Sequence, residues 1–187
     1  MQQLLAHLAR YHPISPAARQ ALEDCLTESV HAKNELLIAQ GQVCRRLYFV
    51  EKGCLRGYYH LEEKEITHWF GFEQDFVTSF HSFTTGQPAM ENIQLMEGAV
   101  LWSVSREELL RLLDAHHELE RLVRIAYEKY YLRLEERYVN AQFKSAAERY
   151  EQLLEQAPYI LERAPLGYVA SYLGISQETL SRVRSRL

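Results

Sequence analysis

The strongest constraint on the fold of this chain lies in residues 166–183, close to the C-terminal end. Apolar or small residues stand there at the spacing at which two short helices pack across a tight turn. Those positions are Val169, Ala170, Leu173, Gly174, Ile175, Leu180 and Val183. Ala170 must be small because the second helix crosses close to it, and Gly174 supplies the positive φ that the turn needs. The segment therefore predicts a helix-turn-helix whose second helix starts at Ser176.

The second predicted helix has polar side chains on its outer face, of the types that reach base edges and phosphates in DNA. They are Gln177, Glu178, Ser181 and Arg182, with Ser176 as the cap and Arg186 one turn further on. Any two packed helices would show some of this apolar spacing, but the small residue, the turn glycine and the apolar frame together are much rarer. We therefore expect double-stranded DNA as a partner, with Arg182 reading a base and Arg186 holding a phosphate.

The charge of the chain is unevenly distributed, and its formal net value is −4 at pH 7. From Ala141 to the end six basic residues stand against five acidic ones, so this part is +1 and the first 140 residues are −5. Residues 182–187 hold three arginines and no acidic residue. Positive charge is thus concentrated where DNA phosphates would be met, and the acidic remainder would repel DNA in other orientations.

Composition is that of an ordinary globular protein, with 47% hydrophobic and 25% charged residues. No apolar run approaches the roughly 20 residues of a membrane span. The N-terminus is too polar for a signal peptide. We therefore expect a cytoplasmic protein that does not enter a membrane. Its three cysteines, Cys25, Cys44 and Cys54, form no close pair, which favours buried thiols over a disulfide framework or a metal site.

The middle of the chain, residues 34–103, consists of short runs rich in β-branched and aromatic side chains, separated by turn signals such as Lys52-Gly53 and Glu97-Gly98. Short strands at this spacing indicate an antiparallel sandwich or barrel. The predicted strands are 35–39, 46–52, 55–61, 65–72, 91–97 and 99–104. Before them, Ser15-Pro16 predicts a short helix that runs to about Glu28.

A long helix is predicted between the strands and the C-terminal segment. Ser105 and Glu108 form a capping box, and the helix that begins there breaks near 115–117 and continues from about Glu118 to Gln142. Its apolar stripe is wide enough to face its own sandwich and also a helix of a second subunit, which suits two-fold recognition of DNA half-sites. Packing within one chain would explain the stripe as well. The expected dimer contacts are Leu119, Val123, Ala126, Tyr130 and Leu134.

Together these elements resemble the Crp/Fnr family, the cyclic AMP receptor protein-like bacterial transcription regulators. The likeness rests on residues 38–59, with Gly41 and Gly53 at turns, and more specifically on LGISQETLSRVR at 173–184. The resemblance implies an α+β fold: a cyclic nucleotide-binding-like β-sandwich or jelly roll (1–117), a long dimerisation helix (118–142) and a helix-turn-helix domain (143–187). Within the last domain a helix is expected at 145–156 and a connector between Pro158 and Pro165.

The resemblance also implies roles for single residues. The family's base-reading positions fall on Gln177, Glu178 and Arg182, and its phosphate-contacting cap falls on Ser176. Family members often have arginine where Gln177 stands, so the half-site sequence should differ from the commonest one. The chain ends at Leu187, whereas many relatives continue into a β-hairpin wing, so we expect DNA affinity to depend more on the arginine-rich end and on dimerisation. RNA polymerase is a further candidate partner.

The effector region departs from the family pattern. Relatives that bind cyclic nucleotide have a Gly-Glu pair and an Arg-Ser or Arg-Thr pair, but residues 75–94 contain no Gly-Glu, no lysine and no arginine. A buried phosphodiester would lack a cation there. We therefore expect a degenerate effector domain that cyclic AMP does not control. An Fnr-type iron–sulfur cluster is excluded by the missing cysteine cluster.

Aromatic and histidine side chains gather in this same half of the chain. They are Tyr58, Tyr59, His60, His68, Trp69, Phe70, Phe72, Phe76, Phe80, His81 and Phe83. They could bind an apolar effector or a porphyrin, but they could equally form an aromatic core with surface histidines. The effector therefore stays unknown, and no cofactor or metal is expected.

Two other classes of function compete with a DNA-binding regulator. The first is a small-molecule-binding sensor module with vestigial DNA binding. The second is a cupin-like enzyme, which would need two histidines and a carboxylate together on the barrel wall. His60, His68 and His81 are scattered and no catalytic set is legible, so the sequence predicts that the protein is not an enzyme.

Overall fold

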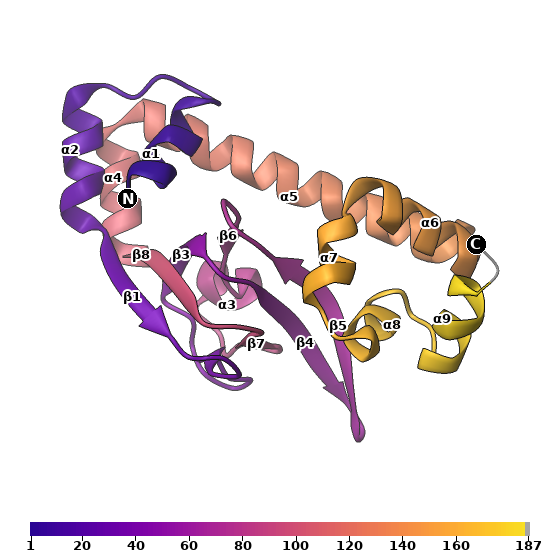
Figure 1. The fold of residues 1–187 in the computed structure, drawn as a ribbon. Coiled ribbons are helices and arrows are strands. Elements are labelled where there is room, and N and C mark those ends of the chain that lie inside the picture. Colours follow the sequence, from indigo (N-terminus) through magenta and orange to yellow (C-terminus); the bar gives the residue numbers. More distant parts are fainter. Residues whose placement is uncertain (186–187) are drawn as a thin grey trace. The chain divides into compact units, whose positions relative to one another are not determined.

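The computed structural model describes residues 1–185 (Figure 1). The chain forms two compact units, and each is described here by itself. Unit 1 comprises residues 1–55 and 71–129, and unit 2 comprises residues 56–70 together with the chain from Tyr130 onward. Residues 56–70 are a β-hairpin in the middle of the chain that groups with the C-terminal helices.

Two four-stranded sheets give the β-sandwich that the sequence predicts. Their strand orders are β1-β8-β3-β6 and β2-β7-β4-β5. The strands are β1 (Thr27–His31), β2 (Leu36–Ile38), β3 (Arg46–Lys52), β4 (Leu55–Leu61), β5 (Lys64–Gly71), β6 (Phe76–Val77), β7 (Asn92–Leu95) and β8 (Ala99–Ser105). In the first sheet β8 pairs antiparallel with β1 and β3. Its register places Thr27 opposite Ser103 and His31 opposite Ala99.

The core of unit 1 lies where helices pack together at one end of the sandwich (Figure 1). The helices are α1 (Gln2–Ala9), α2 (Pro16–Cys25), α4 (Arg106–Ala115) and the start of α5 (His117–Phe143). Their buried residues include Leu4, Leu22, Leu109, Leu112, Leu119 and Leu122. The Ser105 hydroxyl caps α4 by accepting a hydrogen bond from the Glu108 N–H at 3.2 Å, which confirms the predicted capping box.

Several local predictions are wrong. The helix that starts after Ser15 ends at Cys25, not near Glu28, because Leu26 turns extended and residues 27–31 pair with β8. The edge strand β6 and the short helix α3 (Phe80–Thr85) lie in a segment without a clear pattern, and α1 was not predicted either. The predicted connector between Pro158 and Pro165 is a helix, α7 (Pro158–Arg163), because proline is tolerated at a first helical position.

Unit 2 contains four short C-terminal helices. After the end of α5 these are α6 (Ala146–Gln156), α7, α8 (Leu166–Tyr172) and α9 (Gln177–Arg184). The start of α6 is fixed by a second capping box, in which the Ser145 N–H donates to the Glu148 carboxylate at 2.7 Å. Among residues 1–185, no helix is both long enough and apolar enough to cross a bilayer.

Candidate nucleic-acid interface

The turn between α8 and α9 has the geometry that the sequence indicates. Gly174 has φ 68°, and the Ile175 N–H donates to the Ala170 carbonyl at 3.0 Å across the end of α8. A Cβ at Gly174 would meet no atom within 4 Å, so glycine is required there by the backbone angle rather than by crowding. The two helices are thereby joined by a short reversal that the Gly174 and Ile175 N–H groups fasten to the end of α8.

The small and apolar residues of α8, the turn and α9 pack together into one buried cluster, here called the apolar frame. Val169 and Ala170 of α8 are buried, and Leu180 of α9 is 1% exposed. Leu173 is buried as well, and Ile175 and Val183 are partly buried. Because α9 has its apolar side chains on one face only, its opposite face is left for polar residues.

The start of α9 is fixed by Ser176. The Ser176 hydroxyl accepts a hydrogen bond from the Thr179 N–H at 3.2 Å and lies 3.2 Å from the Thr179 hydroxyl. Hydrogen bonding from Ser176, then from the backbone N–H of Glu178, and the charge of Arg182 hold the pKa of the Glu178 carboxyl below its usual value. Glu178 therefore stays ionised at neutral pH, as an acceptor-only group beside a guanidinium.

The residues expected to contact DNA share the open face of α9. Gln177, Glu178, Ser181 and Arg182 are all exposed, and so is Ser176 at the cap. Glu178 and Arg182 are four positions apart and so lie on the same side of the helix. The remaining expected contact, Arg186, lies outside the described residues.

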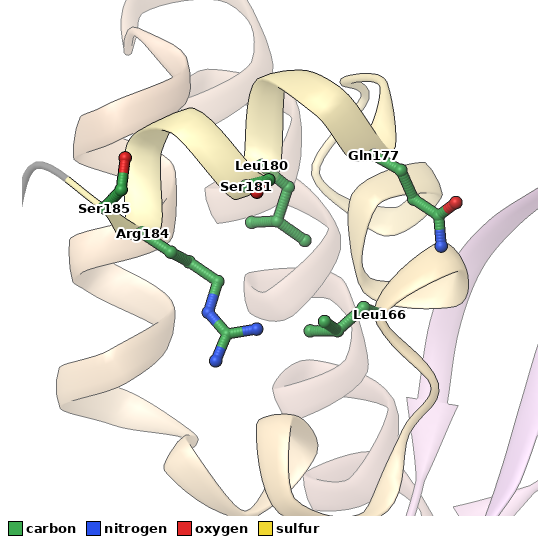
Figure 2. Close-up of a pocket in the computed structure, with 6 residues that line it drawn as sticks. All are labelled: Leu166, Gln177, Leu180, Ser181, Arg184 and Ser185. Atoms are coloured by element: carbon green, nitrogen blue, oxygen red, sulfur yellow. The ribbon is translucent and has the colours of Figure 1, made fainter.

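Beside this face, α8 and α9 enclose a shallow hollow of about 430 Å³. It is lined by Leu166, Gln177, Leu180, Ser181, Arg184 and Ser185. Figure 2 shows the Arg184 side chain pointing across the hollow toward Leu166. Arg184 was not predicted from the sequence, because spacing along one helix does not show which side chains face a neighbouring helix.

Gln177 is placed differently from the other polar residues of the face. A Cβ built on Gly167 would lie 3.0 Å from Gln177 Nε2, so the glutamine amide lies against the backbone at the start of α8. The glutamine side chain therefore packs beside Gly167, where a larger residue would crowd it.

The long helix α5 presents a second candidate interface. Leu119 is only 4% exposed and packs in the core of unit 1, so it has little free surface for the expected dimer contact. Val123 packs against the same core. Further along, four residues at heptad spacing are exposed: Tyr127, Tyr131, Leu134 and Tyr138. Of the expected contacts, Leu134 alone belongs to this tyrosine-rich stripe, while Ala126 and Tyr130 are partly buried.

The segment expected to be degenerate, residues 75–94, forms β6, α3 and the start of β7. In this segment the Ser82 hydroxyl bonds to protein, since it donates to the Gln87 carbonyl at 2.6 Å and accepts from the Cys44 N–H at 2.8 Å. The buried Ser79 hydroxyl has no hydrogen-bond partner among the described residues. One cation reaches the segment from outside, since an Arg106 guanidinium nitrogen lies 3.4 Å from the Thr84 carbonyl. That arginine belongs to α4 and is exposed.

The aromatic and histidine residues do not form a single site. His68 stacks on Tyr59 at 4.4 Å and His60 lies edge-on to Tyr58 at 5.4 Å, both within unit 2. Phe76 packs on Phe49 in unit 1. Within residues 1–185, no three His, Cys, Asp or Glu side chains come close enough to hold a metal ion.

Comparisons with known proteins agree with this architecture. Residues 28–116 match the cyclic nucleotide-binding domain family. FixK2 from Bradyrhizobium japonicum is 20% identical and covers 87% of this chain and 84% of its own, with a TM-score of 0.75. The c-di-GMP responsive global regulator CLP of Xanthomonas campestris is 14% identical, covers 92% and 91%, and has a TM-score of 0.70.

A third similar structure comes from Eubacterium rectale and is described as a transcriptional regulator of the Crp/Fnr family. It is 19% identical and covers 93% of this chain and 85% of its own, with a TM-score of 0.70. No curated protein sequence matches the chain closely enough to count as a relative. Residues 28–116 are thus similar to a cyclic nucleotide-binding domain, and the fold of the chain is similar to these structures over most of their length.

Proposed function

We propose that this chain is a homodimeric transcription regulator that reads a palindromic DNA site through a helix-turn-helix formed by α8 and α9. The observation that carries the proposal is the exposed row Gln177, Glu178, Ser181 and Arg182 on a capped helix whose other face is buried. Its fold is also similar to that of the global regulator CLP and to that of FixK2. The protein acts in the cytoplasm, with RNA polymerase as a candidate partner.

The chemistry of α9 suits the major groove. Arg182 offers paired donors to guanine O6 and N7, and the ionised Glu178 accepts from cytosine N4. Ser176 and Ser181 are short hydroxyl donors suited to phosphate oxygens, and Arg186 is assigned to a phosphate. Ser176 and Glu178 lie in the first turn of α9, and the N-terminal turn of a recognition helix is the part that approaches base edges.

Dimerisation through α5 would place two copies of α9 on successive half-sites. The tyrosine-rich stripe, Tyr127, Tyr131, Leu134 and Tyr138, supports a second copy as its occupant, since heptad spacing is the pattern of two helices packed along their length. Light scattering should report about twice the chain mass of 21.9 kDa. Tyr131→Glu with Tyr138→Glu should give a monomer, and Tyr159→Glu, at an exposed tyrosine on α7, should stay dimeric.

Control by cyclic AMP is not part of the proposal. Residues 75–94 contain no lysine or arginine, and the Ser82 hydroxyl is already bonded to the Gln87 carbonyl and the Cys44 N–H. The cation that contacts this segment at the Thr84 carbonyl, Arg106, is exposed to solvent. Titration calorimetry with millimolar cyclic AMP should show no saturable heat, whereas micromolar affinity would mean that another cation serves the phosphate.

The decisive experiment is selection of bound sites from a random DNA library by the full chain. We expect enrichment of a two-fold symmetric sequence, and a shift of the enriched duplex that weakens steeply with salt. The variant Arg182→Ala should enrich the same palindrome with one base position relaxed in each half. Recovery of no motif above the library background, with folded dimeric protein, would overturn the DNA-binding assignment.

A further inference from the structure

The β4–β5 hairpin, residues 56–70, is held to helix α8 by a buried arginine. Arg56 is 1% exposed, and its guanidinium carbon lies 4.1 Å from the ring centre of Tyr58 and 3.5 Å from that of Tyr168 on α8. Arg56 also pairs with the Glu65 carboxylate on the neighbouring strand. A desolvated guanidinium between two aromatic faces is a strong and directional contact.

A hydroxyl on the same helix joins the hairpin backbone. The Ser171 hydroxyl accepts from the Thr67 N–H at 2.9 Å and donates to the Glu65 carbonyl at 3.0 Å. One short side chain of α8 thus satisfies a donor and an acceptor of β5, 104 and 106 positions away in the sequence. Close by, the rings of Phe70 and Tyr172 pack at 5.1 Å.

A second arginine, on the long helix α5, contacts the other tyrosine of α8, Tyr172. The Arg137 guanidinium of α5 lies 4.5 Å from the ring centre of Tyr172. Burial lowers the pKa of Arg137, opposed by the nearby tyrosines, Tyr172 first. Each of the two tyrosines of α8 therefore stacks under an arginine, one from the hairpin and one from α5, and we call these two contacts the arginine–tyrosine clamp.

The clamp leaves the DNA-reading face open. Tyr168, Ser171 and Tyr172 are on α8, whereas Gln177, Glu178, Ser181 and Arg182 are exposed on α9. The clamp therefore does not shield those four side chains. It fixes α8, and with it α9, relative to the part of α5 that bears Tyr131, Leu134 and Tyr138 of the stripe.

We propose that the arginine–tyrosine clamp is a positioning device that sets the distance between the two half-sites the protein accepts. This inference rests on the proposed DNA-binding dimer. Two reading helices can occupy successive turns of the major groove only if each is held at a fixed place relative to the dimer axis. Arg56 with Tyr168 and Arg137 with Tyr172 are the positioning residues, and none of them needs to touch DNA.

The test varies spacing and sequence separately. Fluorescence anisotropy measures the affinity of the full chain for the selected palindrome, for palindromes with one or two base pairs inserted or removed at the centre, and for a single half-site. The variants are Tyr168→Leu, which removes the ring, Tyr168→Phe, which keeps it, and Arg56→Met. Tyr159→Leu is the matched control, because Tyr159 is an exposed tyrosine on α7. Circular dichroism and light scattering show which variants remain folded dimers.

We expect the wild-type chain, Tyr168→Phe and Tyr159→Leu to share one sharp spacing optimum. Tyr168→Leu and Arg56→Met should lose about tenfold of that preference, the factor that one desolvated cation–π contact of about 1.4 kcal/mol represents. Their half-site affinity should be unchanged, which a general loss of folding would not produce. If Tyr168→Leu is unfolded, Arg56→Met decides the question.

The outcomes separate the two proposals. If the wild-type chain binds none of the duplexes, the proposed function fails. If it binds its palindrome but Arg56→Met keeps the wild-type spacing optimum, the clamp is structural only and the inference is overturned. Equal weakening on every duplex, half-site included, would also overturn it, because the clamp would then support the fold of the reading helices rather than their placement.

Discussion

The sandwich and the α8–α9 pair use polar residues in opposite ways. In the sandwich, buried Ser82 and Thr78 bond to the protein itself: the Ser82 hydroxyl joins two backbone groups, and the Thr78 hydroxyl donates to the Arg46 carbonyl at 2.9 Å. On α9 the polar side chains are exposed above a buried apolar frame. A polar side chain bonded within the protein stabilises the fold, whereas an exposed row of polar side chains is available to a ligand. This difference supports the α8–α9 pair, and not the sandwich, as the candidate site.

The largest expected effect comes from removing the apolar frame. Leu180→Ala should cost about 2–5 kcal/mol of unfolding free energy, because Leu180 is almost fully buried. Leu101→Ala, at an equally buried position in β8, should cost a similar amount. Urea denaturation measures both variants.

Only one of these two variants should affect DNA binding among molecules that remain folded. Leu180→Ala deforms the base of α9 and should weaken binding, while Leu101→Ala lies in the sandwich and should leave affinity unchanged when corrected for the folded fraction. Equal loss of DNA affinity in both variants would show that binding does not depend on α9 more than on the sandwich.

Replacing one glycine in each region should give a smaller but different loss of stability. Gly53 has φ 106°, and a Cβ there would lie 2.7 Å from the Ala99 Cβ, so Gly53→Ala suffers both backbone strain and a clash. Gly174 has φ 68° with open space around it, so Gly174→Ala suffers the backbone strain alone. We expect a loss of more than about 2 kcal/mol for the first and about 1 kcal/mol for the second. Thermal melts give both values, and the reverse order would contradict this account.

Much of this contrast could be predicted from local sequence. The strands at 46–52 and 55–61 were predicted with the bounds that the structure has, since alternating β-branched and aromatic residues between turns are a local signal. The capping box at Ser105 is local in the same sense. The buried frame of α8 and α9 followed from the size and spacing of a few residues.

What could not be predicted depends on distant parts of the chain. Strand β1 forms because β8 pairs with it, although its sequence follows a helix without a break signal. Leu119 has the spacing of an interface residue and is buried by α1, α2 and α4. The contact of Arg56 with Tyr168 joins residues more than a hundred positions apart, and nothing in either neighbourhood indicates the other. Periodicity shows which face is apolar but not what covers it.

The two arginines of the proposed interface separate base reading from phosphate binding. Arg182→Ala should cost about 1–3 kcal/mol on the preferred site and flatten preference at one base position. Arg186→Ala should weaken all sequences alike and reduce the salt slope by about one counterion. Anisotropy titrations at several salt concentrations distinguish the two. If Arg182→Ala weakened specific and random DNA equally, α9 would be docked differently from the proposal.

The smallest effect concerns two glutamates near helix N-termini, Glu108 in the first region and Glu178 in the second. Hydrogen bonds from the Ser105 hydroxyl and backbone lower the pKa of Glu108, and the Ser176 hydroxyl leads the causes that lower the pKa of Glu178. A lowered pKa in the folded protein means that each contribution to stability is present above the usual glutamate value of about 4.3. It is lost as the pH falls through the lower folded value.

Carboxyl titration by NMR should find both values below that of a free glutamate. Ser176→Ala should raise the pKa of Glu178 toward its usual value and leave Glu108 unchanged, and Ser105→Ala should do the reverse. Specific DNA adds a further distinction, because a carboxylate that accepts from cytosine N4 is held in its ionised form. Bound DNA should therefore lower the pKa of Glu178 further and leave that of Glu108 unchanged. An unchanged Glu178 in the complex would remove this glutamate from the set of base-reading residues.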